Sequence, residues 1–157
     1  MRVESADYLR RVYKSICLGW GAPEHQAEAF ADGILAGDLF GHEAQGIAIA
    51  QLDAVMVRDN QINLTAEPTI ELEGPSFGAL NANRCLGQYA MVKAMDMAIE
   101  KAKQSAVGVV WVHSWHDIGC ASAYTKRALD HNMVGILSVN TVPLTAPYGG
   151  REMLMSA

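Results

Sequence analysis

Two short stretches of the sequence combine residue types that bind substrates and move protons. The first is the polar segment 41–46, which reads Gly-His-Glu-Ala-Gln-Gly. The second, 113–120, reads His-Ser-Trp-His-Asp-Ile-Gly-Cys and follows a valine-rich run typical of a buried strand. Loops at the carboxyl ends of strands are where α/β proteins bind ligands. We therefore expect the second stretch to belong to a site, with Asn140-Thr141, after the next expected strand, as a weaker third candidate.

Each stretch also has an interpretation without chemistry. His42 could cap a helix end, His113 could be an ordinary strand side chain, and a polar loop is often only solvated. A zinc site is a further alternative, because the second stretch and the following segment contain residue types that bind zinc. The candidate ligands are His113, His116, Asp117, Cys120 and His131. Their spacing matches no known zinc motif, so we predict no metal.

Composition excludes several classes of protein. The 157 residues, 50% hydrophobic and 18% charged, suit one globular domain. A net charge of -5 without a basic block argues against nucleic-acid binding. Three scattered cysteines favour a reduced, cytoplasmic protein, and no apolar run reaches the roughly 18 residues of a membrane span. No GxGxxG, P-loop or GxSxG motif occurs, so a Rossmann fingerprint is not expected.

The first part of the chain should be helical, because its apolar residues recur at helical spacing. Ser5 is placed to cap a first helix that ends at Gly19, and Pro23 suits the first turn of a second helix. A third helix follows the first polar stretch. We therefore predict a helical amino-terminal segment over 1–60, and the first part of a mixed α/β domain over 61–157.

Beyond Gln61 the apolar residues alternate, which predicts short strands at 62–64, 70–72 and 77–79. The elements expected after them are a helix over 87–103, a strand over 107–112, a helix over 120–132, a strand over 133–139 and a long loop containing Pro143 and Pro147. This order predicts a mixed α/β fold with a helical amino-terminal layer, followed by alternating strands and helices.

The order and spacing of these stretches resemble the malate/L-lactate dehydrogenase family, which includes ureidoglycolate and sulfolactate dehydrogenases and cyclic-imine reductases. The segments that carry the resemblance are 36–42, Gly46-Ile47, Gly87-Gln88, the strand leading to Gly119, Gly135-Ile136 and 146–150. The resemblance implies a non-Rossmann, cytoplasmic homodimer. It also implies hydride transfer between NADH or NADPH and C2 of a small 2-oxo acid or imine.

Family members continue past the Pro-x-Gly-Gly loop into a Thr-Asn-Pro motif and most of the nicotinamide-binding domain. This sequence ends at Ser156-Ala157, where that motif would begin. We therefore expect either a fragment of a longer protein, or one half of a split protein that works with a complementary carboxyl-terminal half. On this interpretation most cofactor-binding residues lie outside the present chain.

The resemblance assigns roles to positions at which this sequence differs from the family. The family's Ser-His pair matches Ala44-Gln45, and the arginine that holds the substrate carboxylate matches Ile49. Glutamine donates hydrogen bonds but does not carry a proton at neutral pH. Isoleucine removes the cation and leaves a carboxylate unpaired. A substrate without a carboxylate at this place is therefore expected.

The family's second histidine, two residues before Gly119, matches Asp117, and His116 lies one residue upstream. Aspartate donates a proton at neutral pH only when burial raises its pKa above the ordinary value of about 4. The ordinary pKa of histidine already suits that role, so His116 is favoured over Asp117 as the proton donor. Gln45 and His42 are then expected to orient the substrate. The remaining substrate-binding candidates are Ala44, Ile49, Asn140 and Thr141.

Three hypotheses follow from the sequence. The first is an oxidoreductase of this family with a changed substrate. The second is a catalytically degenerate relative that serves as a binding or assembly subunit. The third is a zinc-binding domain. The sequence favours the first, because the order of the family's loops and elements persists, although function depends on the site itself.

Overall fold

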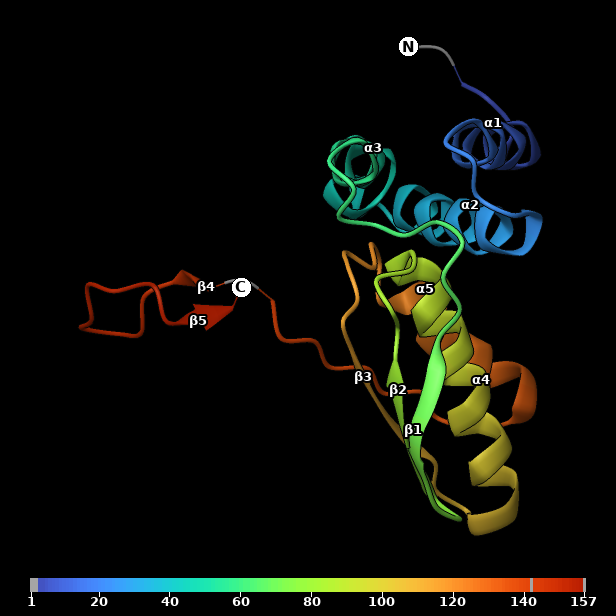
Figure 1. Cartoon of the computed structure of the whole chain (residues 1–157), viewed down its shortest axis with the longest axis vertical. Coiled ribbons are helices and arrows are strands. Elements are labelled where there is room, and N and C mark those ends of the chain that lie inside the picture. Colours follow the sequence, from blue (N-terminus) through green and yellow to red (C-terminus); the bar gives the residue numbers. More distant parts are fainter. Residues whose placement is uncertain (1–2, 142, 157) are drawn as a thin grey trace.

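The computed structural model describes residues 3–141 and 143–156. The helical layer comprises α1 (Ala6–Gly19), α2 (Glu24–Leu39), the 3₁₀ turn η1 (Glu43–Gln45) and α3 (Ile47–Arg58). The side chain of Ser5 accepts the backbone N–H of Tyr8 at 3.2 Å and caps α1, as predicted. In Figure 1 this layer lies above a small sheet, at one end of its strands.

The sheet has three strands in the order β1-β2-β3. The hairpin strands β1 (Thr69–Glu73) and β2 (Phe77–Asn81) are antiparallel, and β3 (Val109–His113) runs parallel to β2. A parallel pair needs a crossover, and α4 (Gly87–Ser105) provides it. The helix covers one face of the sheet, where Gly78 and Leu80 are buried. The opposite face has no covering layer among the described residues (Figure 1).

After β3 the chain forms α5 (Ser122–Thr125) and the 3₁₀ helix η2 (Lys126–His131). It ends in a small hairpin of β4 (Pro143–Thr145) and β5 (Met155–Ser156). The hairpin extends away from the rest of the molecule (Figure 1).

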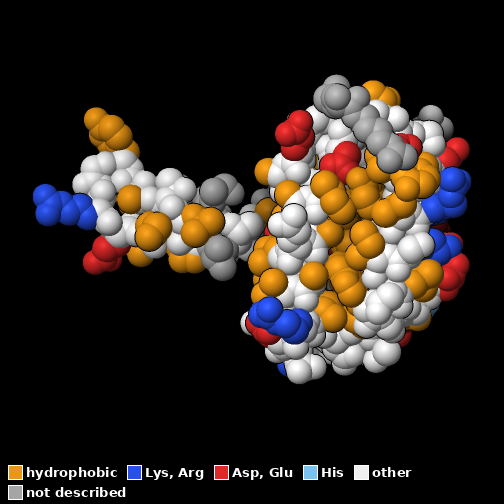
Figure 2. All heavy atoms as spheres, turned by 90° about the horizontal axis from the view of Figure 1, so that it is seen from above, with side chains coloured by type: hydrophobic (Ala, Val, Ile, Leu, Met, Phe, Trp, Pro, Cys, Tyr) orange, Lys and Arg blue, Asp and Glu red, His pale blue; other side chains and the backbone are white. Residues whose placement is uncertain are grey.

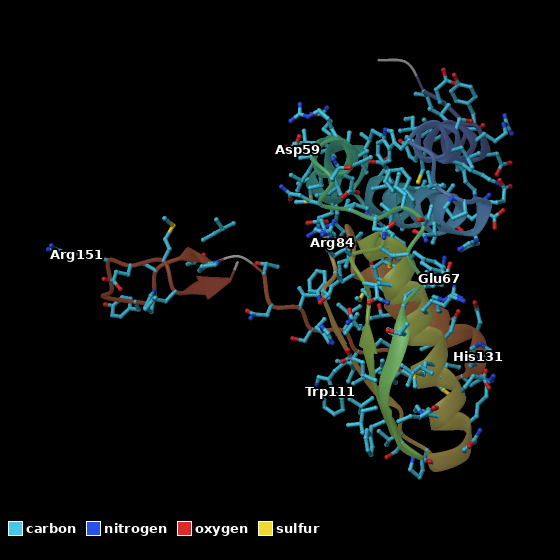
Figure 3. The ribbon with its side chains drawn as sticks, in the orientation of Figure 1. Asp59, Glu67, Arg84, Trp111, His131 and Arg151 are labelled. Atoms are coloured by element: carbon cyan, nitrogen blue, oxygen red, sulfur yellow. The ribbon has the colours of Figure 1, made fainter. Side chains whose placement is uncertain are left out.

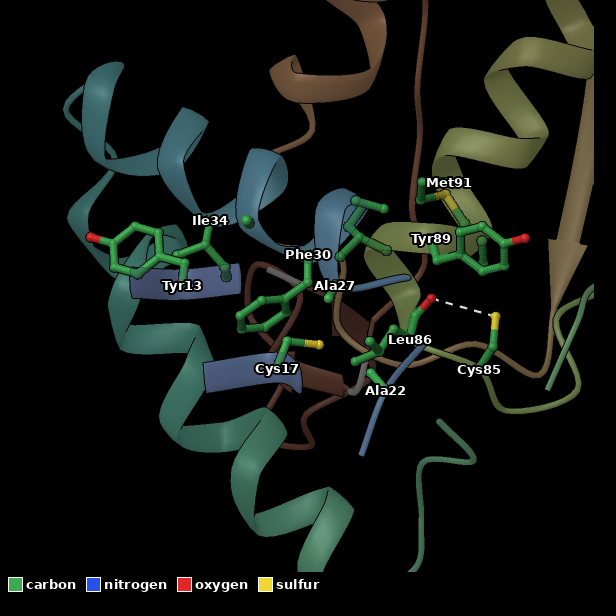
Figure 4. Packing of buried hydrophobic residues seen from close by; sticks show 14 of the residues in the cluster. Tyr13, Cys17, Ala22, Ala27, Phe30, Ile34, Cys85, Leu86, Tyr89 and Met91 are labelled. Atoms are coloured by element: carbon green, nitrogen blue, oxygen red, sulfur yellow. Dashed lines mark hydrogen bonds between the residues drawn. The ribbon is translucent and has the colours of Figure 1, made fainter. Parts of the chain in front are cut away.

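The hydrophobic core lies between α1, α2 and the first turn of α4 (Figure 4). Phe30 and Ile34 of α2 and Leu86 at the start of α4 are completely buried. The rings of Trp20 and Phe30 meet edge to face, with their centroids 5.2 Å apart. Burial of each large apolar side chain stabilises the fold by about 1.5–3 kcal/mol. This packing fixes the helical layer to the end of α4 that carries the candidate site.

The cysteines are buried and unpaired, in agreement with the expectation of free thiols. Burial raises the pKa of Cys17 and of Cys85 to about 12. Because the thiolate is the reactive form, these two side chains are inert core residues. Among the residues that the structure describes, no helix has both the length and the apolar character needed to cross a bilayer.

The mixed α/β fold with a helical amino-terminal layer is confirmed, but the strand expected at 62–64 is wrong. In this segment Ile62 N–H donates to Met56 O, and Asn63 N–H donates to Arg84 O. The Ile62 side chain is buried in the helical core. The alternation therefore reflects one anchored residue in a connection between α3 and β1, and not a pleated strand.

The predictions after β3 are also partly wrong. The segment 133–139 alternates in burial but pairs with no strand in the described part of the chain. Its Gly135 packs closely against the carbonyl oxygen of Thr125, where a Cβ would lie at 2.4 Å. The helix expected over 120–132 divides into the short α5 and η2, which end at Asn132 with φ 55°. The expected long loop contains β4 and β5. The proposed boundary at residue 60 stays a prediction.

A buried polar contact joins α3 to α4. Asp53 and Gln88 are completely buried, and Gln88 Nε2 donates to Asp53 Oδ2 at 3.0 Å. Their other oxygens, Asp53 Oδ1 and Gln88 Oε1, have no hydrogen-bond partner. Burial raises the pKa of Asp53 to about 7; the Gln88 bond opposes this rise, and the nearby charge of Asp117 adds to it. The protonated form of Asp53 is therefore favoured below neutral pH.

This raised pKa predicts a specific effect of Asp53→Asn. In the unfolded chain aspartate has a pKa of about 3.9, so the stability contributed by protonated Asp53 is complete below about pH 4 and is lost as the pH rises to about 7. Asparagine stays neutral throughout. We expect the variant's free energy of unfolding, relative to the original chain, to increase over this range by up to about 1.4 kcal/mol per pH unit. Urea unfolding at several pH values measures it.

Asp59→Asn is the matched control, because Asp59 is more exposed and forms only a surface ion pair with Arg58 at 2.8 Å. It should show no such increase with pH. The free energies of unfolding of Asp53→Asn and of the original chain could instead differ by a constant amount from about pH 4 to about pH 7. That result would contradict the neutral form of Asp53.

Candidate functional site

The first polar stretch forms a tight turn between α2 and α3. His42 N–H donates to Gly37 O at 2.9 Å, and Gln45 N–H donates to His42 O at 2.8 Å. A Cβ at Gly37 would lie only 2.4 Å from the carbonyl oxygen of Gln45. Only glycine permits this approach, so α2 fixes the backbone of Gln45 directly. The side chains of His42 and Gln45 remain exposed.

Asp38 holds the other end of this turn, although the sequence had not singled it out. Its Oδ1 accepts the N–H of Ile47, the first residue of α3, at 3.1 Å. Its Oδ2 accepts the hydroxyl of Tyr13 at 2.7 Å. Burial and this bond raise the pKa of Tyr13 to about 12, so the hydroxyl keeps its proton. The carboxylate thus stabilises the positive end of α3.

The second polar stretch lies against the first turn of α4. A Cβ at Gly87 would be 2.3 Å from the carbonyl oxygen of His116 and 2.2 Å from that of Asp117. Asp117 Oδ1 accepts the N–H of Gly119 at 2.7 Å and closes a turn. At Gly119, where φ is +64°, a Cβ would lie 3.1 Å from the carbonyl oxygen of Gln45. The two stretches therefore meet backbone to backbone.

The hydrogen bond of His116 defines which ring nitrogen carries a proton. His116 Nε2 lies 2.8 Å from the carbonyl oxygen of Gln61. A carbonyl oxygen can only accept, so Nε2 must be the donor. In the neutral ring, Nδ1 is then the unprotonated nitrogen and the one that exchanges a proton with another molecule. The side chain as a whole is half-buried.

The structure brings Gln45, His116 and Asp117 into one region. Ile49 is half-buried and packs against the helical core. His42 and Ala44 are exposed on the turn beside Gln45. Asn140 and Thr141 are exposed in the segment that leads towards the β4–β5 hairpin (Figure 1). Their proposed contact with substrate stays a prediction.

Three further residues of this region were not predicted to be functional. Asp53 lies four residues after Ile49 on α3, a spacing that places both on one helix face and was the available signal. Its partner Gln88 follows Gly87, which contacts the second stretch. Arg84 donates from Nε to the same Gln61 carbonyl as His116, at 3.0 Å. The sequence carried no pattern that pointed to Arg84.

His113 belongs to a separate cluster. Its Nε2 lies 2.7 Å from Glu71 Oε2, and its Nδ1 lies 2.9 Å from Ser114 Oγ. Asn81 Nδ2 donates to Glu71 Oε1 at 3.1 Å, so these side chains tie the three strands together on the sheet face opposite α4. Within residues 3–141 and 143–156, no group of three or more histidine, cysteine or acidic side chains could hold a metal ion.

A hollow of about 490 Å³ lies between α2, α4 and α5. Its lining includes His25, Tyr89 and Lys93, but not Gln45, His116 or Asp117. This hollow is therefore distinct from the region where the two polar stretches meet.

The sequence is similar to those of known dehydrogenases. The family model described as malate/L-lactate dehydrogenase matches residues 5–157. The L-sulfolactate dehydrogenase of Methanothermobacter thermautotrophicus is 32% identical over 155 residues, which cover 99% of this chain and 45% of that protein. The malate dehydrogenase of Pyrococcus abyssi is 36% identical over 135 residues, which cover 86% of this chain and 37% of that protein.

The fold is also similar to those of solved dehydrogenase structures. The malate dehydrogenase of Pyrococcus horikoshii superimposes with a TM-score of 0.90 at 28% identity, covering 98% of this chain and 44% of that one. The sulfolactate dehydrogenase of Methanocaldococcus jannaschii gives a TM-score of 0.90 at 28% identity, with 98% and 45% coverage. This chain spans less than half the length of these relatives. The protein belongs to the malate/L-lactate dehydrogenase family.

Proposed function

We propose that this chain is the substrate-binding half of a nicotinamide-dependent dehydrogenase. In the oxidation direction the substrate is a small 2-hydroxy acid. In the reduction direction it is the corresponding 2-oxo acid, or an imine that is reduced to an amine. Membership of the family supports oxidoreductase chemistry. The observation that carries the proposal is the orientation of His116, whose Nε2–H is held by the Gln61 carbonyl, so that Nδ1 is the unprotonated nitrogen of the neutral ring.

Reduction at C2 requires a proton as well as a hydride. The nicotinamide cofactor supplies the hydride when bound, and the substrate oxygen or nitrogen then needs a proton. His116 donates that proton from Nδ1 in its charged form and accepts it in the reverse reaction. Asp117 holds the turn through Gly119 and so positions the histidine. The exposed side chains of Gln45 and His42 orient the substrate by hydrogen bonds.

The residues described here do not by themselves fit a nicotinamide dinucleotide. The chain has no glycine-rich phosphate loop, and the hollow between α2, α4 and α5 lies apart from His116. We propose that NADH or NADPH is held mainly by the complementary carboxyl-terminal half. The chain spans 45% and 37% of the length of two relatives. A cytoplasmic location fits the free thiols.

The uncovered face of the sheet is the proposed contact with this complementary half. Trp111 of β3 is 62% exposed and Leu72 of β1 is 59% exposed. Figure 3 shows Trp111 on the side of the sheet opposite α4. The polar Glu71, Asn81 and His113 cluster shares this face. Large apolar side chains exposed together in this way are typical of an interface.

The outer side of the helical layer is the proposed contact between two copies of the assembled enzyme. Figure 2 shows hydrophobic side chains gathered on this face. Tyr8 of α1 and Leu52 and Val55 of α3 are each more than a third exposed. The two contacts use different sides of the molecule, so both can form in one assembly.

The role of His116 can be tested in the enzyme assembled with its complementary half. His116→Gln retains an amide that can donate to Gln61 O but cannot exchange a proton. We expect reduction of a 2-oxo acid by NADH or NADPH to fall by about 100-fold or more. The decrease in the absorbance of NADH or NADPH measures this rate. His131→Gln, which changes an exposed histidine of η2 that has no role in this site, is the matched control and should retain most of the rate.

A His116→Gln rate within about twofold of the original would exclude His116 as the proton donor. Native mass spectrometry with NADH and NADPH addresses the function itself. If the assembled protein binds neither cofactor, the proposed dehydrogenase is wrong, and a binding or assembly subunit is the better description.

The sheet interface predicts the effect of Trp111→Lys. Because Trp111 is largely exposed in the isolated chain, a lysine should leave its unfolding temperature nearly unchanged. Burying the lysine charge against an apolar partner should prevent association with the complementary half. Native mass spectrometry reports the assembly, and circular dichroism reports the unfolding.

Leu129→Lys, at 63% exposure in η2 and in neither proposed contact, is the matched control and should leave this association intact. Assembly of the Trp111→Lys chain to the same mass as the original would show that the sheet face is not the contact.

A further inference from the structure

Arg84 lies directly beside His116. Its Nε donates to Gln61 O at 3.0 Å, and His116 Nε2 donates to the same oxygen at 2.8 Å. Arg84 Nη2 also donates to Asn60 O at 2.5 Å. The guanidinium and the imidazole therefore share one acceptor, and each is oriented by it. In Figure 3, Arg84 lies where the helical layer meets the sheet.

Most of the hydrogen-bonding capacity of Arg84 is unused. A guanidinium has five N–H donors, and two of these are engaged by the Gln61 and Asn60 carbonyls. Arg84 is exposed and forms no ion pair with a carboxylate of residues 3–141 or 143–156. By contrast, Arg58 and Arg127 are each paired with an aspartate. Arg84 thus retains a full charge and the two terminal nitrogens that bind an anion in parallel.

The backbone at Arg84 is held in an uncommon conformation. Asn83 and Arg84 have φ values of 51° and 62°, a left-handed region that non-glycine residues rarely adopt. Asn83 N–H donates to Asn81 Oδ1 at 2.9 Å, and Arg84 N–H donates to Ser114 O at 2.9 Å. These bonds place Arg84 just before α4, whose first turn has no side-chain cap and adds positive potential. Strain of this kind clusters at functional positions.

We propose that Arg84 binds the anionic group of the substrate, a carboxylate or sulfonate, beside the His116 ring. This proposal rests on the proposed dehydrogenase function and names its substrate class. The family arginine that holds the carboxylate is replaced by Ile49, which packs into the core. Arg84 provides a cation from the loop before α4 instead. The anion is held by the terminal nitrogens of Arg84, with C2 of the substrate turned towards His116.

A purely structural role for Arg84 makes a different prediction. Its two bonds to Asn60 O and Gln61 O hold the chain that follows α3, and this alone would explain its presence. Lysine keeps the charge but not the parallel pair of donors. Arg84→Lys therefore distinguishes anion binding by two parallel N–H donors from anion binding by positive charge alone. Arg58→Gln, which removes an exposed arginine at the end of α3, is the matched control.

The test is NMR titration of the full chain with oxamate, a small analogue of a 2-oxo acid, at constant ionic strength. We expect saturable shifts of the His116 ring and of the Gln61 and His116 amides. Arg84→Gln should weaken binding by about tenfold or more, the loss expected for charge-assisted bonds. Arg84→Lys should be intermediate, and Arg58→Gln should match the original chain. Circular dichroism confirms that each variant is folded.

Unchanged oxamate affinity in folded Arg84→Gln, or no oxamate binding by the original chain, would overturn the proposal. In the assembled enzyme, Arg84→Gln should raise KM for the 2-oxo acid far more than it lowers kcat. Turnover with an unchanged KM would refute the role of Arg84 while leaving the dehydrogenase function intact. If oxamate binding depended on Arg84 but the assembled protein bound neither NADH nor NADPH, the anion site would be supported and the proposed dehydrogenase function would be contradicted.

Discussion

Backbone contact at three glycines is the constraint on which the candidate site depends. Gly37 admits the carbonyl of Gln45, Gly119 meets the same carbonyl, and Gly87 admits the carbonyls of two consecutive loop residues. Any side chain at Gly37 or Gly87 would place a Cβ within 2.4 Å of a carbonyl oxygen. Two polar loops far apart in the sequence are therefore fixed to α2, to α4 and to each other. A site on loops gains the rigidity of the helices beneath it.

The same packing explains the buried carboxyl group behind the site. Asp53 is enclosed between α3 and α4, close enough to Asp117 for the charge of Asp117 to raise its pKa. A buried unpaired acceptor costs about 1–3 kcal/mol, and an ionised one costs more. The neutral form reduces that penalty. It also keeps a second negative charge away from the loop that carries His116, where the proposed substrate is an anion.

Much of the fold could be predicted from residue spacing, because local signals and tertiary packing agree. Ser5 caps its helix, and the apolar runs before Asn81 and His113 form β2 and β3 as expected. The failures have physical causes. Ile62 alternates with Leu64 only because it is anchored in the helical core, and 133–139 lacks a neighbouring strand among the described residues. Pairing between strands is not encoded in the period of one segment.

The candidate site was only partly predictable. The residue types near Gln45 and His116 could be recognised, but their meeting depends on glycine contacts that become visible in three dimensions. Nothing in a helical pattern distinguishes the buried Asp53 from an exposed aspartate. Arg84 likewise has no motif, since its importance comes from a left-handed backbone and a carbonyl shared with His116. These features arise from tertiary packing and not from local sequence.

The orientation of the His116 ring is the feature on which proton exchange by this chain depends. NMR of the chain with isotope-labelled histidine, near neutral pH, identifies the protonated ring nitrogen directly. We expect the neutral ring to carry its proton on Nε2, with hydrogen-bond coupling to the Gln61 carbonyl and an unprotonated Nδ1. A proton on Nδ1, or rapid averaging between the two tautomers, would contradict the oriented histidine and the proton transfer derived from it.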